Sequence, residues 1–343
     1  MKRILNTLYV TSEDVYLALD GENIVAKREQ EILARYPLHT LCNVVTFSYL
    51  GASPALLGAC AEREIGFAFC SPRGKFLARV CAESNGNVLL RRTQYRMADS
   101  PAESCRLART MIFGKLCNAR RSIDRTVRDH GPRVDEPALR AVIDQLSALL
   151  PQLLDQTDPD SLRGLEGVGS AAYFRVFDDL ILNGKETFSF TERSRRPPLD
   201  PVNAMLSFAY SLLAHDCASA LESVGLDAYV GFLHRDRPGR TSLALDLMEE
   251  LRPCVADRFV LTAINNRTVT ASDFERRENG AVLFKDEARR RFLRRWQERK
   301  KETLTHPYLS EKLEWGLVPY LQAQLLARTI RGDLEEYPPF LWK

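Results

Sequence analysis

The chain has 343 residues, of which 45% are hydrophobic and 27% are charged, a composition typical of a globular protein with about two domains. No apolar run reaches the roughly eighteen residues of a membrane helix, and the N-terminal stretch lacks the apolar core and cleavage site of a signal peptide, so we expect neither. Eight cysteines without a CxxC pair argue against a zinc site or a disulfide framework and fit a reducing cytoplasm.

The first part of the chain, up to about residue 96, predicts short strands. Apolar runs rich in strand-forming residues lie at residues 4–10, 15–19, 24–25, 44–49, 65–69 and 76–80. The sequence DGEN at residues 20–23 is a hairpin signal. Ser53 before Pro54 predicts the start of one short helix over residues 53–64. Short strands at this spacing are typical of a small β-sandwich.

From about residue 98 onward, apolar residues recur at helical spacing. Helices are predicted over residues 100–128, 137–154, 162–179, 201–220, 286–301 and 307–331, with a further helix after residue 241 and a small non-helical element at 274–282. We therefore expect an α+β protein, with a small β-sandwich domain over residues 1–97 and a larger, all-α-helical domain over residues 98–343.

One stretch, residues 231–253 (GFLHRDRPGRTSLALDLMEELRP), contains several polar side chains that could bind a metal ion. An apolar, strand-like piece ends in His234, a basic turn follows, and the next helix carries Asp246 and Glu249. Residues three apart share a helix face, and two buried carboxylates side by side are costly without a cation. With a histidine nearby, they form a nitrogen-plus-oxygen set that suits Mg²⁺ or Mn²⁺. The structural alternatives are a solvated acidic face and a histidine bonded to the backbone.

Glu166 lies in LRGLEGVGSAAYF, residues 162–174, between Gly164 and Gly167. Glycines near a helix start let another backbone or a ligand approach closely. A glutamate in a helix is usually a surface charge, but the neighbours of this one are largely apolar, a setting in which a bare carboxylate is unexpected. The residues alone leave both interpretations open.

The formal net charge is +3, which is too small to indicate nucleic-acid binding by itself. Arginines nevertheless gather in clusters, at residues 91–96, 120–128, 193–196 and 289–295. Several such clusters on one face would neutralise phosphates. Solvated helix faces paired with nearby acids account for about half of such clusters.

Three stretches together closely resemble the CRISPR-associated integrase family Cas1: LEGVGSAAYF at residues 165–174, PVNAMLSFAYSLL at 201–213, and the stretch 231–253. The resemblance covers essentially the whole chain. The opening LNTLYVTSEDVYLALDGENIVAK and the segment GASPALLGACAE resemble the subtype I-C branch of the family. The resemblance implies an N-terminal β domain used for dimerisation, a hinge, and a larger helical catalytic domain.

The resemblance also implies which residues act. It carries over Glu166, His234 and Glu249 as ligands of one divalent ion, Mg²⁺ or Mn²⁺, and Asp246 as a catalytic carboxylate beside the site. Some family members have aspartate at the position of Glu249, and either residue can bind the ion. We expect arginines near these ligands to contact DNA phosphates, and the candidates are Arg163, Arg175, Arg235, Arg237 and Arg240.

The implied activity is that of a metal-dependent DNA endonuclease and integrase. It joins prespacer 3′-hydroxyl ends to the CRISPR repeat by transesterification, and the same site can cleave single-stranded, double-stranded and branched DNA. The implied assembly is a cytoplasmic homodimer, two of which flank a dimer of the small partner Cas2 in a heterohexamer, with no membrane association. The alternatives are a non-catalytic DNA-binding scaffold and a general repair nuclease for branched DNA.

Overall fold

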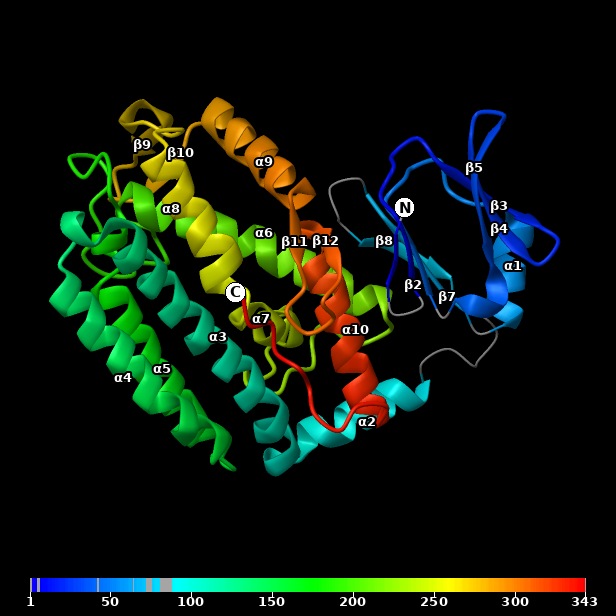
Figure 1. Cartoon of the computed structure of the whole chain (residues 1–343), viewed down its shortest axis with the longest axis horizontal. Helices are drawn as coiled ribbons and strands as arrows, with labels where there is room; N and C mark the ends of the chain where they lie inside the picture. The colour runs from blue at the N-terminus through cyan, green and yellow to red at the C-terminus, as the bar shows by residue number, and fades with distance from the viewer. Residues whose placement is uncertain are drawn as a thin grey trace.

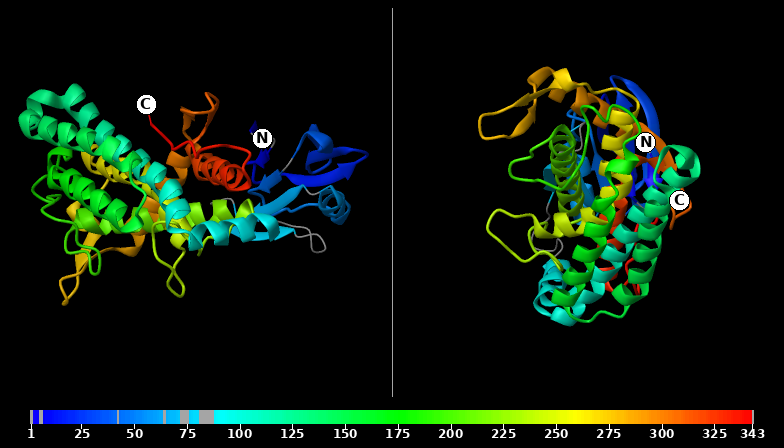
Figure 2. Two further views of the ribbon diagram at one scale, coloured as in Figure 1. Left: turned by 90° about the horizontal axis from the view of Figure 1, so that it is seen from below. Right: turned by 90° about the vertical axis from the view of Figure 1, so that its left-hand side faces the viewer.

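The computed structural model describes residues 2–4, 7–41, 43–63, 65–71, 76–80 and 88–342. The chain forms two β-sheets followed by a helical lobe (Figure 1). In the left panel of Figure 2, the N-terminal strands lie at one end of an elongated molecule and the long helices of the lobe reach the other end.

The N-terminal strands form one mixed and one antiparallel sheet. The mixed sheet has the order β1-β2-β6-β7-β8, formed by β1 (Lys2–Ile4), β2 (Thr7–Val10), β6 (Asn43–Thr46), β7 (Gly66–Cys70) and β8 (Phe76–Val80). The antiparallel sheet consists of β3 (Tyr16–Asp20), β4 (Asn23–Arg28) and β5 (Glu31–Pro37). Because β6 and β7 run parallel, they need a crossover, which α1 (Pro54–Glu62) provides.

Local sequence signals account for several of these elements. Asp20 pairs with Asn23 across the β3–β4 turn, where Gly21 has a φ of 58°. The hydroxyl of Ser53 accepts a hydrogen bond from the amide of Leu56 at 3.2 Å and so caps α1. The two sheets and α1 enclose a common core that includes Leu8, Leu17, Ile24, Val44, Leu56, Cys60 and Phe67. The predicted pair of packed sheets is therefore confirmed.

The lobe contains α2 (Val88–Asp99), α3 (Pro101–His130), α4 (Glu136–Leu154), α5 (Pro159–Arg175), α6 (Pro201–Ser223), α7 (Ser242–Glu249), α8 (Arg258–Asn265), α9 (Asp286–Lys301) and α10 (Val318–Arg331). Ser100, Asp158 and Asp200 each stand before a proline and accept a hydrogen bond from the backbone amide three residues on. These caps start α3, α5 and α6 close to where the sequence predicts helices.

The change from strands to helices comes earlier than expected. α2 begins at Val88, within the part that the sequence analysis assigned to strands, because Leu90 and Gln94 lie one turn apart on a buried face. The domain boundary near residue 97 stays a prediction.

The lobe is helical but not entirely so, which corrects the all-α-helical expectation. The non-helical element expected near residue 274 is a hairpin of β9 (Phe274–Arg276) and β10 (Val282–Phe284). The helix predicted over 307–331 begins only at Val318. The residues before it form a second hairpin of β11 (Thr303–Thr305) and β12 (Lys312–Glu314), whose turn contains Ser310 with a φ of 56°.

The strands and the lobe share an interface. The ring of Tyr320 on α10 meets Tyr9 and Phe47 edge-on, with ring centroids 6.3 and 5.3 Å apart. The lobe's own core is built around α3, which packs along α4, α5 and α7. Among the described residues, no helix is both long and apolar enough to cross a membrane.

Candidate active site

Two of the predicted ligands converge on one positively charged atom. Glu166 lies on α5 and Glu249 at the end of α7, and between them stands Lys115 of α3. The ammonium nitrogen of Lys115 contacts Oε1 of Glu166 and lies 2.8 Å from Oε2 of Glu249. The side chains of Lys115 and Glu249 are 8% and 3% exposed, and that of Glu166 is 25% exposed. The three helices thus bring two distant carboxylates to one cation position.

Asp246 organises the loop that carries His234. Its Oδ2 accepts hydrogen bonds from the amides of Phe232 and Leu233 at 2.6 and 2.9 Å, and its Oδ1 accepts from the amide of His234 at 3.0 Å. These bonds replace strand pairing, so the apolar piece before His234 is a loop and not the expected strand. The same Oδ1 lies 2.6 Å from Nδ1 of the His234 ring. With its proton on Nδ1, the ring directs the lone pair of Nε2 towards Glu249.

His234 lies beside the other oxygen of Glu249. Its Nε2 lies 3.8 Å from Oε1 of Glu249. Oε1 also pairs with the guanidinium of Arg252 at 3.0 Å. Burial would raise the pKa of Glu249, but the nearby positive charges, chiefly those of Arg252 and Lys115, outweigh burial and lower this pKa to about 2. Glu249 is therefore ionised at neutral pH.

Two glycines allow these close approaches. A Cβ added to Gly231 would lie 2.8 Å from Oδ2 of Asp246, so only glycine lets that carboxylate reach the loop amides. A Cβ at Gly169 would lie 2.7 Å from the side chain of Leu116, so this glycine sets the spacing of α3 and α5. Gly164 and Gly167, which flank Glu166, face no heavy atom within 4 Å of an added Cβ. The close approach that the sequence suggested belongs to Gly169.

The predicted arginines occupy different positions. Arg163 donates to the carbonyl of Leu233 at 2.9 Å and pairs with Asp160, so it braces the His234 loop. Arg235 also pairs with Asp160, at 3.1 Å. Arg175 donates to Gln145 of α4, Arg237 is exposed, and Arg240 is half-buried. Of these five arginines, Arg163 and Arg235 line the same cavity as His234.

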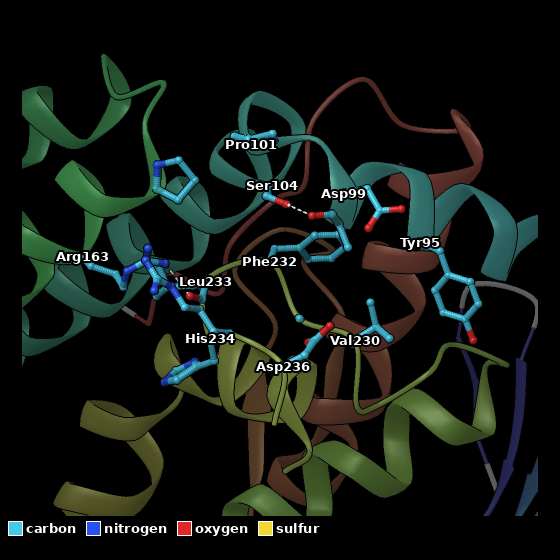
Figure 3. Close-up of a pocket in the computed structure, with 14 residues that line it drawn as sticks. Tyr95, Asp99, Pro101, Ser104, Arg163, Val230, Phe232, Leu233, His234 and Asp236 are labelled. Atoms are coloured by element: carbon cyan, nitrogen blue, oxygen red, sulfur yellow. Dashed lines mark hydrogen bonds between the residues drawn. The ribbon is translucent and has the colours of Figure 1, made fainter. Parts of the chain in front are cut away.

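A cavity of about 440 Å³ opens beside His234 (Figure 3). It lies between the end of α2, the start of α3 and the His234 loop. Its lining includes Tyr95, Asp99, Arg163, Phe232, His234 and Asp236. Hence the histidine is accessible from an open, partly aromatic and partly charged pocket.

The predicted ligands match a divalent cation in donor type. Within the described ranges, no three His, Cys, Asp or Glu side chains already stand in the spacing of metal ligands. The place between the two glutamates is taken by the ammonium of Lys115. Oε2 of Glu249 is buried and, apart from that ion pair, has no hydrogen-bond partner. Two carboxylates at a cation position, with an imidazole nitrogen 3.8 Å from one of them, are a donor set that Mg²⁺ or Mn²⁺ accepts.

Neither Lys115 nor Arg252 was predicted from the sequence. Lys115 lies four residues after Met111 and three before Asn118, which are both buried, so helical spacing could have marked it as a buried lysine. A lysine on a buried face needs a charged partner. Arg252 follows Glu249 by three residues in the predicted helix, and this spacing was likewise a readable signal.

The comparison with known sequences places the chain in a class. A family model described as CRISPR associated protein Cas1 matches residues 8–298, so the chain is a CRISPR-associated protein. The chain is 51% identical over 347 residues to CRISPR-associated endonuclease Cas1 2 of Rhodospirillum rubrum, with 100% of both chains covered. This protein therefore belongs to the Cas1 family.

Solved structures agree with the fold. A casposase bound to integration product superposes with a TM-score of 0.80 and 21% identity, covering 99% of this chain and 100% of the other. A chain of a partial Cas6-RT-Cas1--Cas2 complex superposes with a TM-score of 0.75 and 24% identity, covering 98% of each. At these identities, the likeness shows the fold alone.

Proposed function

We propose that this protein is a DNA endonuclease and integrase of CRISPR adaptation that depends on Mg²⁺ or Mn²⁺. It joins the 3′-hydroxyl ends of a prespacer to the CRISPR repeat by transesterification, and it cleaves single-stranded, double-stranded and branched DNA. The observation that carries the proposal is that Glu166 and Glu249, from separate helices, meet at one cation position, with Nε2 of His234 3.8 Å from the other oxygen of Glu249. Full-length likeness to an endonuclease supports it.

Each residue of the site has a role in this reaction. Glu166, Glu249 and Nε2 of His234 would hold the divalent ion, which when bound would supply positive charge against the phosphate and the attacking oxygen. Asp246 acts through His234, because its bond to Nδ1 fixes the tautomer and the ring direction. Arg163 and Arg235, which line the same cavity as His234, position the DNA backbone, as do Arg175, Arg237 and Arg240 further out.

Structural neighbours support a proposal for the partners of this protein. Because one structural neighbour holds an integration product and another belongs to a complex with Cas2, we propose DNA and Cas2 as partners. The protein pairs into a homodimer through its β domain, residues 1–97, and two dimers flank a Cas2 dimer in a cytoplasmic heterohexamer. The segments quoted above for the subtype I-C branch support assignment to that branch.

Strand joining tests the proposal. With Mn²⁺, the wild type is expected to join a prespacer to a supercoiled plasmid that carries the array. His234→Ala is expected to abolish joining while leaving duplex binding intact, and His215→Ala on the exposed side of α6 is the matched control. Normal joining by His234→Ala would contradict the site assignment, whereas duplex binding without joining by the wild type would favour the non-catalytic DNA-binding scaffold. Equal joining to a plasmid without the repeat would favour the branched-DNA repair nuclease.

A further inference from the structure

Lys115 holds a position that a bound metal would need. Its ammonium contacts both predicted carboxylate ligands at once, and its side chain is almost fully buried. Within the described part of the chain, this is the one ion pair that Glu166 makes, its other polar contact being the hydroxyl of Ser170 at 2.7 Å. A divalent ion bound by Glu166 and Glu249 therefore has to replace this ammonium.

The charges explain why a cation belongs there. Glu249 is buried and Glu166 faces the same point, so without a cation between them the two carboxylates would repel each other in a poorly hydrated setting. Arg252 neutralises one side of Glu249, but the space between the glutamates receives its positive charge from Lys115. The ammonium thus holds the two carboxylates in place before a metal arrives.

The ammonium also has a place to move to. A cavity of about 20 Å³ adjoins it and is lined by Lys115, Ser170, Tyr173, Tyr210, Arg252 and Asp257. This volume suffices for one water-sized group. The cavity wall includes the carboxylate of Asp257, which accepts a hydrogen bond from the hydroxyl of Tyr210 at 2.6 Å. A short rotation of the lysine side chain would carry its charge from one carboxylate environment to another.

We propose that Lys115 is a built-in counter-ion, which occupies the cation position in the metal-free protein and withdraws towards Asp257 when a divalent ion binds. This proposal rests on the metal site of the proposed function. Lys115 is a positioning residue in it: it keeps Glu166 and Glu249 close together, and the metal has to compete with it. Wild-type affinity for the metal is consequently weaker than the same ligands would give without the lysine.

Metal binding measured without DNA tests this role. Lys115→Met keeps the length of the side chain but removes its charge, and Mn²⁺ binding is followed by electron paramagnetic resonance or calorimetry. We expect Lys115→Met to bind Mn²⁺ about ten-fold more tightly than the wild type, or roughly 1.4 kcal/mol. In the absence of metal, its thermal midpoint should be lower, and Mn²⁺ should restore it. Lys185→Met, which removes an exposed lysine paired with Asp178, is the matched control and should change neither quantity.

The outcomes separate the two proposals. Mn²⁺ binding by the wild type, with no tighter binding by Lys115→Met, would overturn the counter-ion role alone. No Mn²⁺ binding by either protein would overturn the proposed metal site together with this role. A structure of the wild type with Mn²⁺ gives a second readout that does not depend on the variant's folding. Withdrawal of the ammonium from Glu249 supports the proposal, and an ammonium still held between the two glutamates contradicts it.

Discussion

The hydroxyl of Tyr337 donates a hydrogen bond to Oε1 of Glu250, the residue that follows the predicted ligand Glu249. The amide of Phe340 donates to the other oxygen of this carboxylate at 2.8 Å, and Gln322 of α10 donates to Oε1 at 2.9 Å. The segment after α10 runs back over the lobe to reach these groups (Figure 1). The position of the end of α7, and with it Glu249, therefore depends on this C-terminal tail, residues 337–342.

Tyr337→Phe is expected to destabilise the protein. The change leaves the buried Glu250 carboxylate without one of its donors, at a cost of about 1–3 kcal/mol. Chemical denaturation of the two proteins measures the difference. Tyr308→Phe removes the hydroxyl of an exposed tyrosine and serves as the control. Equal stability of Tyr337→Phe and the wild type would contradict the role given to this bond.

Asp246→Asn is expected to weaken metal binding and joining. The two carboxylate oxygens of Asp246 accept hydrogen bonds from three backbone amides and interact with the imidazole of His234. Asparagine has one uncharged oxygen for these bonds, so it holds the His234 ring less firmly. Loss of such a partner lowers metal affinity or activity by about 10–100-fold. Calorimetry with Mn²⁺ and strand-joining rates measure both effects. Asp144→Asn, an exposed change on α4, should leave them unaltered.

Gly231→Ala is expected to damage the site without touching a predicted ligand. The added Cβ would lie 2.8 Å from Oδ2 of Asp246 and 2.9 Å from backbone and side-chain carbons of Ser242. Overpacking of this kind typically costs about 1–3 kcal/mol, and displacement of Asp246 would also release the loop before His234. Thermal unfolding and joining assays report the two losses. Gly167→Ala lies on an exposed helical position with open space and should be neutral or stabilising.

His306 makes stability depend on pH. Burial lowers the pKa of His306 to about 4, although its hydrogen bond with Gln322 acts in the opposite direction. In the unfolded chain its pKa is about 6.5, so the unfolded state binds the proton first as pH falls. The stabilising contribution is complete above pH 6.5 and is lost as pH falls towards 4, at about 1.4 kcal/mol per pH unit and about 3 kcal/mol in all.

A comparison with His306→Asn isolates this contribution. Burial also raises the pKa of the nearby Glu250 to about 7. The contribution of Glu250 to the stability of the protein therefore has the opposite pH dependence: it is lost as pH rises from about 4.5 to 7. Because both proteins contain Glu250, the difference between their free energies of unfolding reports on His306. We expect this difference to shrink as pH falls from 6.5 to 4. A difference that stays constant over this range would show that His306 is not buried in its neutral form.

Local signals predicted much of the fold. The DGEN turn, the Ser53 cap and the Asp-Pro starts of α5 and α6 act over a few residues, so their effect is readable from the sequence. The hairpin of β11 and β12 was missed because its residues also fit a helical pattern. In this region a buried hydrogen bond between the side chains of His306 and Gln322 holds the hairpin against α10, so a tertiary contact outweighs local helix propensity.

The candidate site was predictable to the extent that its residues are close in sequence. Asp246 and Glu249 share a face of α7, and His234 reaches them through a short loop. The partnership of Lys115 with Glu166 and Glu249 joins residues that lie 51 and 134 positions away along the chain. No spacing rule connects such residues, because only the packing of α3 against α5 and α7 brings them together.

The middle turn of α3 has two tasks. Lys115 faces the two glutamates, while Asn118 donates to the carbonyls of Glu250 and Phe340, both at 2.7 Å. A Cβ added at Gly114 would come within 3.0 Å of Pro339. A rotation of this turn would thus move the cation position and the tail anchor at once. During divergence of this family, substitutions in residues 114–118 should therefore be accepted only together with matching changes in residues 337–342.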